Sequence, residues 1–208
     1  MVDALLDVLG ETAEQAKERP VSMGEVLDRL GDAGFSLICL IVALPFLQPF
    51  NLGPITGAAG VTFMALGWQL ARGHHAPWVP ARLRSVSLSG RMWGRLLGLG
   101  RFVVRTGRRF TRQRHVEWTS GPRGNRICGG LIALGGFLLV LPFPGLPFSN
   151  TLPALMILSV CVAEMEEDGL LLVAALVFLA ASLVYFAFIL AALFAGGGAA
   201  LDWVQDQV

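Results

Sequence analysis

Residues 45–54 read PFLQPFNLGP and residues 142–153 read PFPGLPFSNTLP, two proline clusters in otherwise apolar surroundings. Proline has no backbone N–H and its ring clashes with the preceding turn, so each cluster predicts a break in a helix. The same interruption therefore occurs twice along the chain. This repetition predicts two apolar hairpins that are broken at matching places.

The composition is typical of an integral membrane protein. The chain has 208 residues, of which 54% are hydrophobic and 15% are charged, and its mean hydropathy is +0.64. These values are too apolar for an ordinary soluble domain of this size. In lipid, the backbone groups that a helix break releases must face protein or a water-lined cavity. Matching breaks in the two halves of a chain therefore point to a transport-type binding site.

Charge is strongly segregated, although the net charge is only +1. Of the 16 basic residues, 13 lie between Arg72 and Arg126, whereas eight of the 15 acidic residues lie among the first 32. Lys and Arg near membrane spans stay on the cytoplasmic side, so the connection between the hairpins is predicted to be cytoplasmic. The acidic start has no basic n-region, and we expect no cleavable signal peptide.

The predicted fold class is an all-α polytopic membrane protein with an internal repeat. The first apolar run, Phe35 to Leu47, is only ~20 Å long as a helix, against ~30 Å for the hydrocarbon core. The hairpins therefore either cross fully or re-enter from one side. The expected parts are an acidic amphipathic arm at 1–33, a first membrane hairpin at 34–80, a basic cytoplasmic or interfacial segment at 81–126, a second membrane hairpin at 127–168, a terminal transmembrane helix at 169–195 and a tail at 196–208.

Local signals place some of the helix ends. Ser22 followed by Glu25 forms a capping box, which predicts that a helix of the arm begins there. The triplet Gly196 to Gly198 is expected to end the terminal helix and release the tail.

The basic segment supplies the candidates for binding lipid head groups. Arginines recur in it at helical spacing between apolar side chains, which is typical of a helix that lies on the inner leaflet. They either set the topology and hold anionic lipid in general, or grip a phosphorylated lipid or glycan carrier by bidentate contacts. The candidate residues are Arg72, Arg101, Arg105, Arg108 and Arg112.

Polar side chains around the two breaks are the candidates for a substrate site. They can hydrogen-bond a sugar or lipid head group, and the helix N-termini that follow the prolines favour an anionic group. The alternative is that they only cap and turn the hairpins, since Asn and Pro are common turn residues. The candidate residues are Gln48, Asn51, Pro54, Thr56, Gln69, Ser149, Asn150 and Pro153.

Four carboxylates at 164–168 support an enzymatic alternative, because ionisable groups near apolar spans are functional candidates. Glu164 and Asp168 are four residues apart and are expected to share a helix face. We expect these acids to be solvated at the cytoplasmic end of their span. No nucleophile triad, phosphate loop or metal-spacing motif accompanies them in the sequence, so no catalytic residue is assigned. In a transporter, Glu164 and Asp168 are candidates for ion coupling.

Neither a metal nor another cofactor is predicted. Cys39, Cys128 and Cys161 are isolated in apolar runs and lack C-x-x-C spacing. We interpret them as small buried hydrophobic residues.

Several motifs, taken in order, resemble the ExoD family of bacterial exopolysaccharide-synthesis proteins. The resemblance covers residues 21 to 195 and depends on the order and spacing of the motifs. It implies a bacterial inner-membrane protein linked to surface polysaccharide production, and it carries no agreed set of catalytic residues. The motifs are the Pro-rich first hairpin, Gln69-x-x-x-Gly73-x-x-x-Pro77-Trp78-Val79-Pro80, Pro142-Phe143 with Asn150-x-Leu152-Pro153-Ala154, and Glu167-Asp168-Gly169.

The sequence thus favours a multi-pass inner-membrane transporter or flippase-like protein that moves an anionic lipid or a lipid-linked glycan. One alternative is an accessory or regulatory partner of a polysaccharide export complex, whose acidic arm docks on another protein or on its own basic segment. The other is an intramembrane enzyme. The expected partners are membrane lipids, above all anionic head groups, with polysaccharide-synthesis machinery and a second copy of the chain as alternatives. Nucleic acid is not expected.

Overall fold

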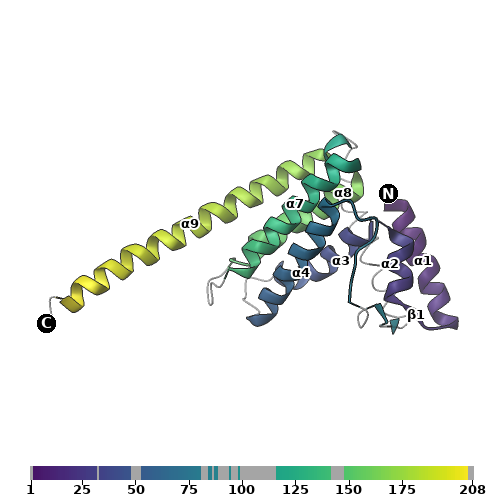
Figure 1. Ribbon diagram of the computed structural model, residues 1–208, viewed down its shortest axis with the longest axis horizontal. Coiled ribbons are helices and arrows are strands. Elements are labelled where there is room, and N and C mark those ends of the chain that lie inside the picture. The colour runs from purple at the N-terminus through teal and green to yellow at the C-terminus, as the bar shows by residue number, and fades with distance from the viewer. Residues whose placement is uncertain are drawn as a thin grey trace.

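The computed structural model is built almost entirely from helices (Figure 1). It describes residues 2–31, 33–47, 53–80, 84, 85, 87, 88, 94, 98, 116–141 and 148–205. The predicted helical class is confirmed, with one short β-pair that the sequence did not indicate. The elements are α1 (Val2–Glu18), β1 (Val21–Ser22), α2 (Met23–Leu30), α3 (Ala33–Ala43), the 3₁₀ helix η1 (Leu44–Leu47), α4 (Pro54–Ala71), β2 (Ser87–Leu88), the 3₁₀ helix η2 (Val116–Trp118), α7 (Gly121–Val140), α8 (Thr151–Glu166) and α9 (Gly169–Gln205).

Both predicted helix breaks are confirmed. In the first half, α3 tightens into η1, which contains Pro45, and α4 begins at Pro54. In the second half, α7 ends at Val140, and α8 begins at Thr151 with Pro153 in its first turn. Proline is tolerated in the first turn because the N–H groups there have no intrahelical partner. The residues within the two breaks, 48–52 and 142–147, lie outside the described part of the chain.

The two halves pack crosswise. The α4 helix makes its largest contact with α7, and α3 packs mainly on α8, whereas α3 and α4 touch little. The arms of the second half, α7 and α8, also pack on each other, more extensively than α3 packs on α8. Figure 1 shows α4 and α7 side by side. A duplication that relates α3 to α7 and α4 to α8 makes these two pairs equivalent. The first arm of each half therefore packs against the second arm of the other.

Glycines let α4 and α7 approach closely at two levels. A Cβ atom on Gly60 would lie 2.6 Å from the carbonyl oxygen of Gly136, and one on Gly67 would lie 2.5 Å from that of Gly129. The two glycines of each helix are seven residues apart and are matched in antiparallel order. Small residues at such crossings let helix backbones pack closely, as at helix contacts within membranes.

The hydrophobic core lies where these four helices meet the start of α9. Its largest fully buried side chains include Phe35 of α3, Phe63 of α4, Ile132 of α7 and Ile157 of α8. Leu172 of α9 completes this cluster. The crosswise pairs thus share one core.

The last helix, α9, leaves the bundle and extends well beyond α4 and α7 (Figure 1). Within the described residues, one segment is long and apolar enough to cross a membrane, and it is Gly169–Ala192 of this helix. The expectation that Gly196 to Gly198 end the helix was wrong, because α9 continues to Gln205. Glycine costs only ~1 kcal/mol relative to alanine inside a helix, so a triplet weakens a helix without forcing it to stop.

The structure describes only parts of the basic segment. Most of residues 81–126 lie outside the described part of the chain. The α7 helix already begins at Gly121, so Arg123 and Arg126 belong to it and precede the apolar run. The β2 strand, also from this segment, pairs antiparallel with β1 through Val21 and Leu88.

Candidate functional site

Two buried polar side chains join the halves of the chain. The amide Nδ2 of Asn150 donates to the hydroxyl oxygen of Thr56 over 3.4 Å, although 94 residues separate them. Asn150 is 6% exposed and Thr56 is 4% exposed. Ser149, which precedes Asn150 in the chain, is buried as well. We call Thr56, Ser149 and Asn150 the interhairpin site.

Local backbone geometry brings Asn150 to this position. Phe148 has a φ of 63°, a left-handed conformation that is uncommon for a residue with a side chain. Asn150 follows at the N-cap position of α8, yet its side chain does not cap the helix. Its amide bonds Thr56 in the first turn of α4 instead. The turn-and-cap interpretation therefore does not account for this side chain.

The electrostatics of the interhairpin site favour an anionic ligand. Both α4 and α8 begin here, and the N-terminus of a helix carries a partial positive charge. The prolines in the first turns of α4 and α8 fix the backbone there but contribute no N–H. Neutral hydroxyl and amide groups supply donors and acceptors suited to a sugar.

The other predicted substrate residues are not all gathered here. Gln48 and Asn51 lie outside the described residues. Gln69 lies 13 positions after Thr56 on α4, which is roughly 20 Å along the helix axis. Its Oε1 accepts from the N–H of Trp78 over 2.6 Å, so it fastens the chain that follows α4. Gln69 therefore lies at the other end of α4 from Thr56, and the structure does not bring the two together.

Glu164 occupies the interface between α3 and α8. Its side chain is 2% exposed, and its Oε2 accepts a hydrogen bond from the hydroxyl of Ser36 over 2.5 Å. We expected the acids of 164–168 to be solvated, and for Glu164 this was wrong. The packing of α3 over the end of α8 covers the carboxyl group.

Asp168 has a capping role at the junction of α8 and α9. Its Oδ1 accepts from the N–H of Leu170 over 2.9 Å, at the start of α9. Glu167 adopts the left-handed conformation with a φ of 54°, and the N–H of Asp168 bonds the carbonyl oxygen of Ala163. The α8 helix thus ends before Asp168. The expectation that Glu164 and Asp168 share a helix face was wrong, although Asp168 is also buried, at 1% exposed.

The three cysteines are free and buried, as predicted. They come from α3, α7 and α8 and belong to the main core. Among the described residues, no group of three or more His, Cys, Asp or Glu side chains is arranged to hold a metal ion. The cysteines therefore act as core residues in this part of the molecule.

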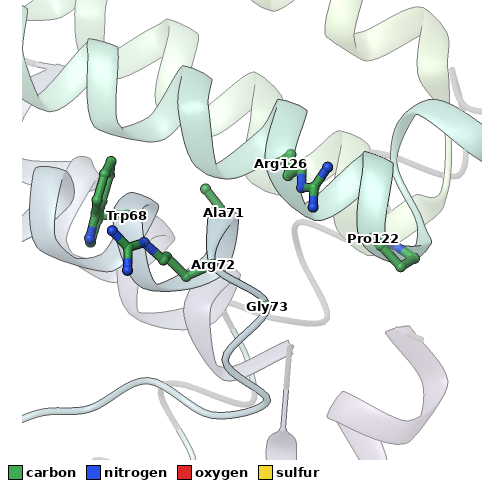
Figure 2. A pocket seen from close by; sticks show the side chains of 6 residues that line it. All are labelled: Trp68, Ala71, Arg72, Gly73, Pro122 and Arg126. Carbon is green, nitrogen blue, oxygen red and sulfur yellow. The ribbon is translucent and has the colours of Figure 1, made fainter.

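Of the predicted head-group arginines, the structure describes Arg72. Its guanidinium lies over the ring of Trp68, 4.5 Å from the ring centroid, at the end of α4 (Figure 2). Arg101, Arg105, Arg108 and Arg112 lie outside the described residues. Sequence reasoning did not single out Arg126, which faces the same pocket as Arg72 from the first turns of α7. The sequence signal for Arg126 was its position directly before the apolar run that begins at Ile127.

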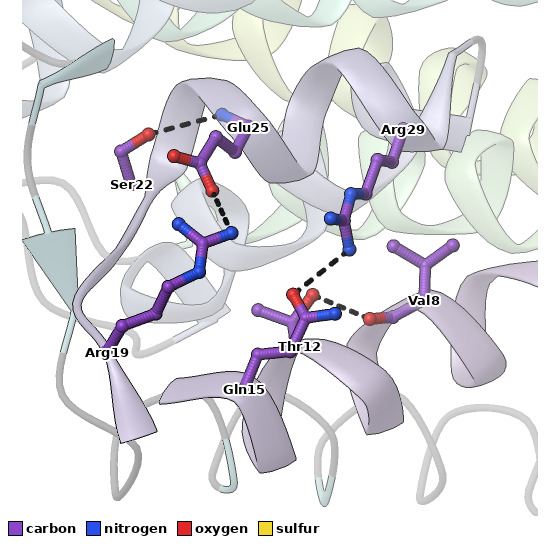
Figure 3. A network of polar contacts seen from close by, with 7 residues as sticks. All are labelled: Val8, Thr12, Gln15, Arg19, Ser22, Glu25 and Arg29. Carbon is purple, nitrogen blue, oxygen red and sulfur yellow. Dashed lines mark hydrogen bonds and ion pairs between the residues drawn. The ribbon is translucent and has the colours of Figure 1, made fainter. Parts of the chain in front are cut away.

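The acidic arm docks on its own chain. Ser22 caps α2 by accepting from the N–H of Glu25 over 3.3 Å, which confirms the predicted helix start (Figure 3). The Glu25 carboxylate pairs with Arg19, and Arg29 donates to Gln15, which ties α2 to α1. Asp28 pairs with Arg84 of the basic segment over 2.5 Å, beside the β1–β2 contact.

The chain is similar to known proteins over most of its length. The family model described as exopolysaccharide synthesis, ExoD, matches residues 5–188. A protein named ExoD from Rhizobium meliloti (strain 1021) is 30% identical over 194 residues, which cover 93% of this chain and 80% of that protein. An uncharacterized protein from Synechocystis sp. is 24% identical over 195 residues, covering 89% of this chain and 86% of that protein. No solved structure matches.

Proposed function

The chain belongs to the ExoD family of exopolysaccharide-synthesis proteins, and from that premise we propose that it is a multi-pass inner-membrane protein that moves an anionic lipid or a lipid-linked glycan. In this proposal the interhairpin site receives the polar head group. The role is that of a transporter or flippase-like protein, without covalent change to the substrate.

Exposed apolar side chains support embedding of more than one helix. Large apolar residues on the outer faces of α4, α7 and α9 are between 37% and 73% exposed. A contiguous apolar surface is rare on soluble proteins, and lipid is the natural environment for one on helices. The residues are Ile55, Val61, Met64 and Trp68 on α4, Ile127, Leu134, Phe137 and Val140 on α7, and Val173, Leu176, Val177, Leu183, Val184 and Phe188 on α9.

The contact between Asn150 and Thr56 is the observation that carries the proposal. It links the start of α8 to the start of α4, so the two helices that follow the breaks meet at buried polar side chains. Broken helices whose N-termini converge on buried polar groups form the substrate sites of many transporters. The crosswise pairing of α3 with α8 and of α4 with α7 supports an internal repeat around this point.

Glu164 is the candidate for ion coupling. Moving an unpaired carboxylate out of water is costly, so a buried acid tends to bind a proton or a partner. Ser36 and Glu164 bridge α3 and α8, one of the two crosswise pairs. Protonation or deprotonation of Glu164 would therefore change the strength of the contact between α3 and α8, which belong to different halves.

The alternatives have less support. The accessory-partner alternative rested on the acidic arm as a docking surface for another protein. Part of the arm instead contacts its own chain, because β1 pairs with β2 and Asp28 pairs with Arg84. The enzyme alternative drew on four neighbouring carboxylates. Asp168 caps α9, and Glu164 accepts from Ser36 inside the bundle. Neither arrangement resembles a pair of acids placed on either side of a substrate.

Transport is tested with purified full-length protein in vesicles that carry a fluorescent lipid-linked sugar in one leaflet. Accessibility of the probe to a membrane-impermeant quencher reports its movement, and chromatography reports chemical change. We expect the protein to accelerate movement without any new product. Asn150→Leu should slow it about tenfold, the effect of losing roughly 1.4 kcal/mol of hydrogen bonding.

Matched variants separate the site from general damage. Ser159→Ala removes a hydroxyl on the same helix that bonds only within α8, to Leu155, and Thr62→Val does the same on α4, where the hydroxyl bonds Ala58. Both should transport at the rate of the unmodified protein, whereas Thr56→Val should be slow. An equal rate in Asn150→Leu and Ser159→Ala, or the appearance of cleavage or transfer products, would show that the proposal is wrong.

A further inference from the structure

A surface pocket of about 370 Å³ lies between the end of α4 and the start of α7 (Figure 2). This volume is within the ~300 to 1,000 Å³ range of small-ligand pockets. The pocket lies at the opposite end of α4 from the interhairpin site. It is lined by Trp68, Ala71, Arg72, Gly73, Pro122 and Arg126.

The pocket carries two positive charges and has no acidic lining residue. Arg72 comes from α4 and Arg126 from α7, so both helices contribute an arginine to the lining of the pocket (Figure 2). Neither arginine takes part in the ion pairs found among the described residues, Arg19 with Glu25 and Arg84 with Asp28. Two arginines in the lining of one pocket that has no acidic lining residue favour an anionic ligand.

Trp68 holds Arg72 beside the pocket. The guanidinium carbon of Arg72 lies over the ring of Trp68, 4.5 Å from the ring centroid, in a cation–π contact. Planar guanidinium donors match the oxygens of a phosphate group, to which they bind in a bidentate manner.

The two helix ends at the pocket carry partial charges of opposite sign, so their effects on an anion offset each other. The end of a helix exposes carbonyl oxygens that repel negative charge. At the end of α4, the N–H of Arg72 bonds the carbonyl oxygens of Trp68 and Gln69, and the N–H of Gly73 bonds that of Leu70. The start of α7 lies across the pocket and contributes the positive end of its dipole.

We propose that this pocket binds the phosphate group of an anionic lipid head group, with Arg72 and Arg126 donating to its oxygens. The surroundings favour a lipid over free phosphate. Trp68 and Ile127 are exposed beside the two arginines and continue the apolar flanks of α4 and α7. Aromatic and basic residues together at the end of an apolar helix mark the membrane interface. The inference rests on the membrane placement in the proposed function and is independent of transport.

Binding is measured by calorimetry on the purified full-length protein in a neutral detergent. The probe is dihexanoyl phosphatidic acid, and dihexanoyl phosphatidylcholine and inorganic phosphate are titrated in parallel. We expect phosphatidic acid to bind and phosphatidylcholine to bind at least tenfold more weakly. Arg72→Gln and Arg126→Gln should each raise the Kd for phosphatidic acid about tenfold, and Arg72→Lys should raise it less, because lysine keeps the charge without the bidentate geometry.

Arg123→Gln is the matched control. Arg123 is exposed in the first turn of α7 and does not line the pocket. The Kd of this variant for phosphatidic acid should therefore stay within about twofold of that of the unmodified protein. All four arginine variants replace exposed side chains, and equal elution volumes confirm that they are folded. The proposal is overturned if phosphatidic acid does not bind, or if Arg72→Gln and Arg126→Gln behave like Arg123→Gln. Equal affinity for inorganic phosphate would overturn the lipid assignment. Binding that persists in a protein without transport activity would contradict the proposed function alone.

Discussion

Glu164 and Ser36 form a polar contact in the interior of the helical bundle. The hydrogen bond crosses from α3 to α8, and nonpolar residues of the core surround these helices. Inside a protein, a hydrogen bond is worth little in net terms, but a buried group that loses its partner costs ~1–3 kcal/mol. Removing one of the two partners should therefore lower stability by more than the net contribution of the hydrogen bond itself.

We predict that Glu164→Ala lowers the free energy of unfolding by about 3 kcal/mol, because it leaves the Ser36 hydroxyl without this partner and opens a cavity. Glu164→Gln keeps an acceptor oxygen for Ser36 and should lower it by about 1 kcal/mol. Unfolding of the protein in mixed detergent micelles measures both. Glu117→Ala removes an exposed acid in η2 and should change the free energy of unfolding by no more than ~0.5 kcal/mol. Equal losses for Glu164→Ala and Glu117→Ala would contradict the role of the buried contact.

Residue chemistry was predictable where it is local and not where it depends on packing. The prolines fixed the helix breaks because each removes a hydrogen bond within its own turn. Asn150 donates to Thr56 across the two halves, and a substrate site at this contact stays a prediction. The burial of Glu164 could not be read from its neighbours in sequence, because α3 covers it. The bond of Gln69 to Trp78 was not predictable either, because it depends on how the chain turns back after α4.

At the scale of elements, the α4–α7 crossing holds the two halves at their closest approach. Gly67 and Gly129 meet there, and so do Gly60 and Gly136, with backbone against backbone. The sequence predicted both helices from their apolar runs. It did not predict their pairing, since a hairpin interpretation places α4 beside α3. The crosswise arrangement becomes visible only when the glycines of α4 and α7 are matched in antiparallel order.

We predict that Gly129→Ala destabilises the protein by ~1–3 kcal/mol, because the added methyl group would overlap the backbone of α4 at Gly67 and Ala71. Its neighbour Gly130 is a matched control, since a methyl group there would meet nothing within 4 Å. Gly130→Ala should be neutral or stabilise α7 by up to ~1 kcal/mol through helix propensity. Thermal unfolding in detergent compares the two. A smaller loss for Gly129→Ala than for Gly130→Ala would mean that the crossing is looser than the structure indicates.

At the scale of the whole molecule, the proposed membrane placement puts the arm and the basic segment on one side of the membrane, because the two are in contact. The β1 strand pairs with β2, and Asp28 pairs with Arg84. The pocket at Arg72 and Arg126 lies at the end of α4 from which the chain continues toward that segment. Arginine enrichment predicts that this side is cytoplasmic. The interhairpin site then lies toward the opposite side, because Thr56 is at the other end of α4.

Helix lengths leave the hairpin geometry to be tested. The 18 residues of α4 correspond to about 27 Å, and the apolar residues 127–140 of α7 to about 21 Å, against ~30 Å for the hydrocarbon core. Under the proposed function we expect both helices to cross fully, with local thinning of the bilayer accommodating the shorter apolar run. A cysteine that replaces Phe148, which is 53% exposed next to the interhairpin site, should react with an impermeant maleimide in intact cells. Cysteines that replace Glu11 or Arg123, both exposed, should react only after permeabilisation.

The three native cysteines are buried, which keeps the background of this labelling low in the folded protein. Labelling at Phe148 in intact cells, together with protection at Glu11 and Arg123, is the pattern that full crossing requires. Protection at all three positions would instead mean that the hairpins re-enter from the cytoplasmic side, because the chain at Phe148 would not reach the periplasm. Labelling at Arg123 in intact cells would reverse the orientation and place the phosphate pocket on the periplasmic face.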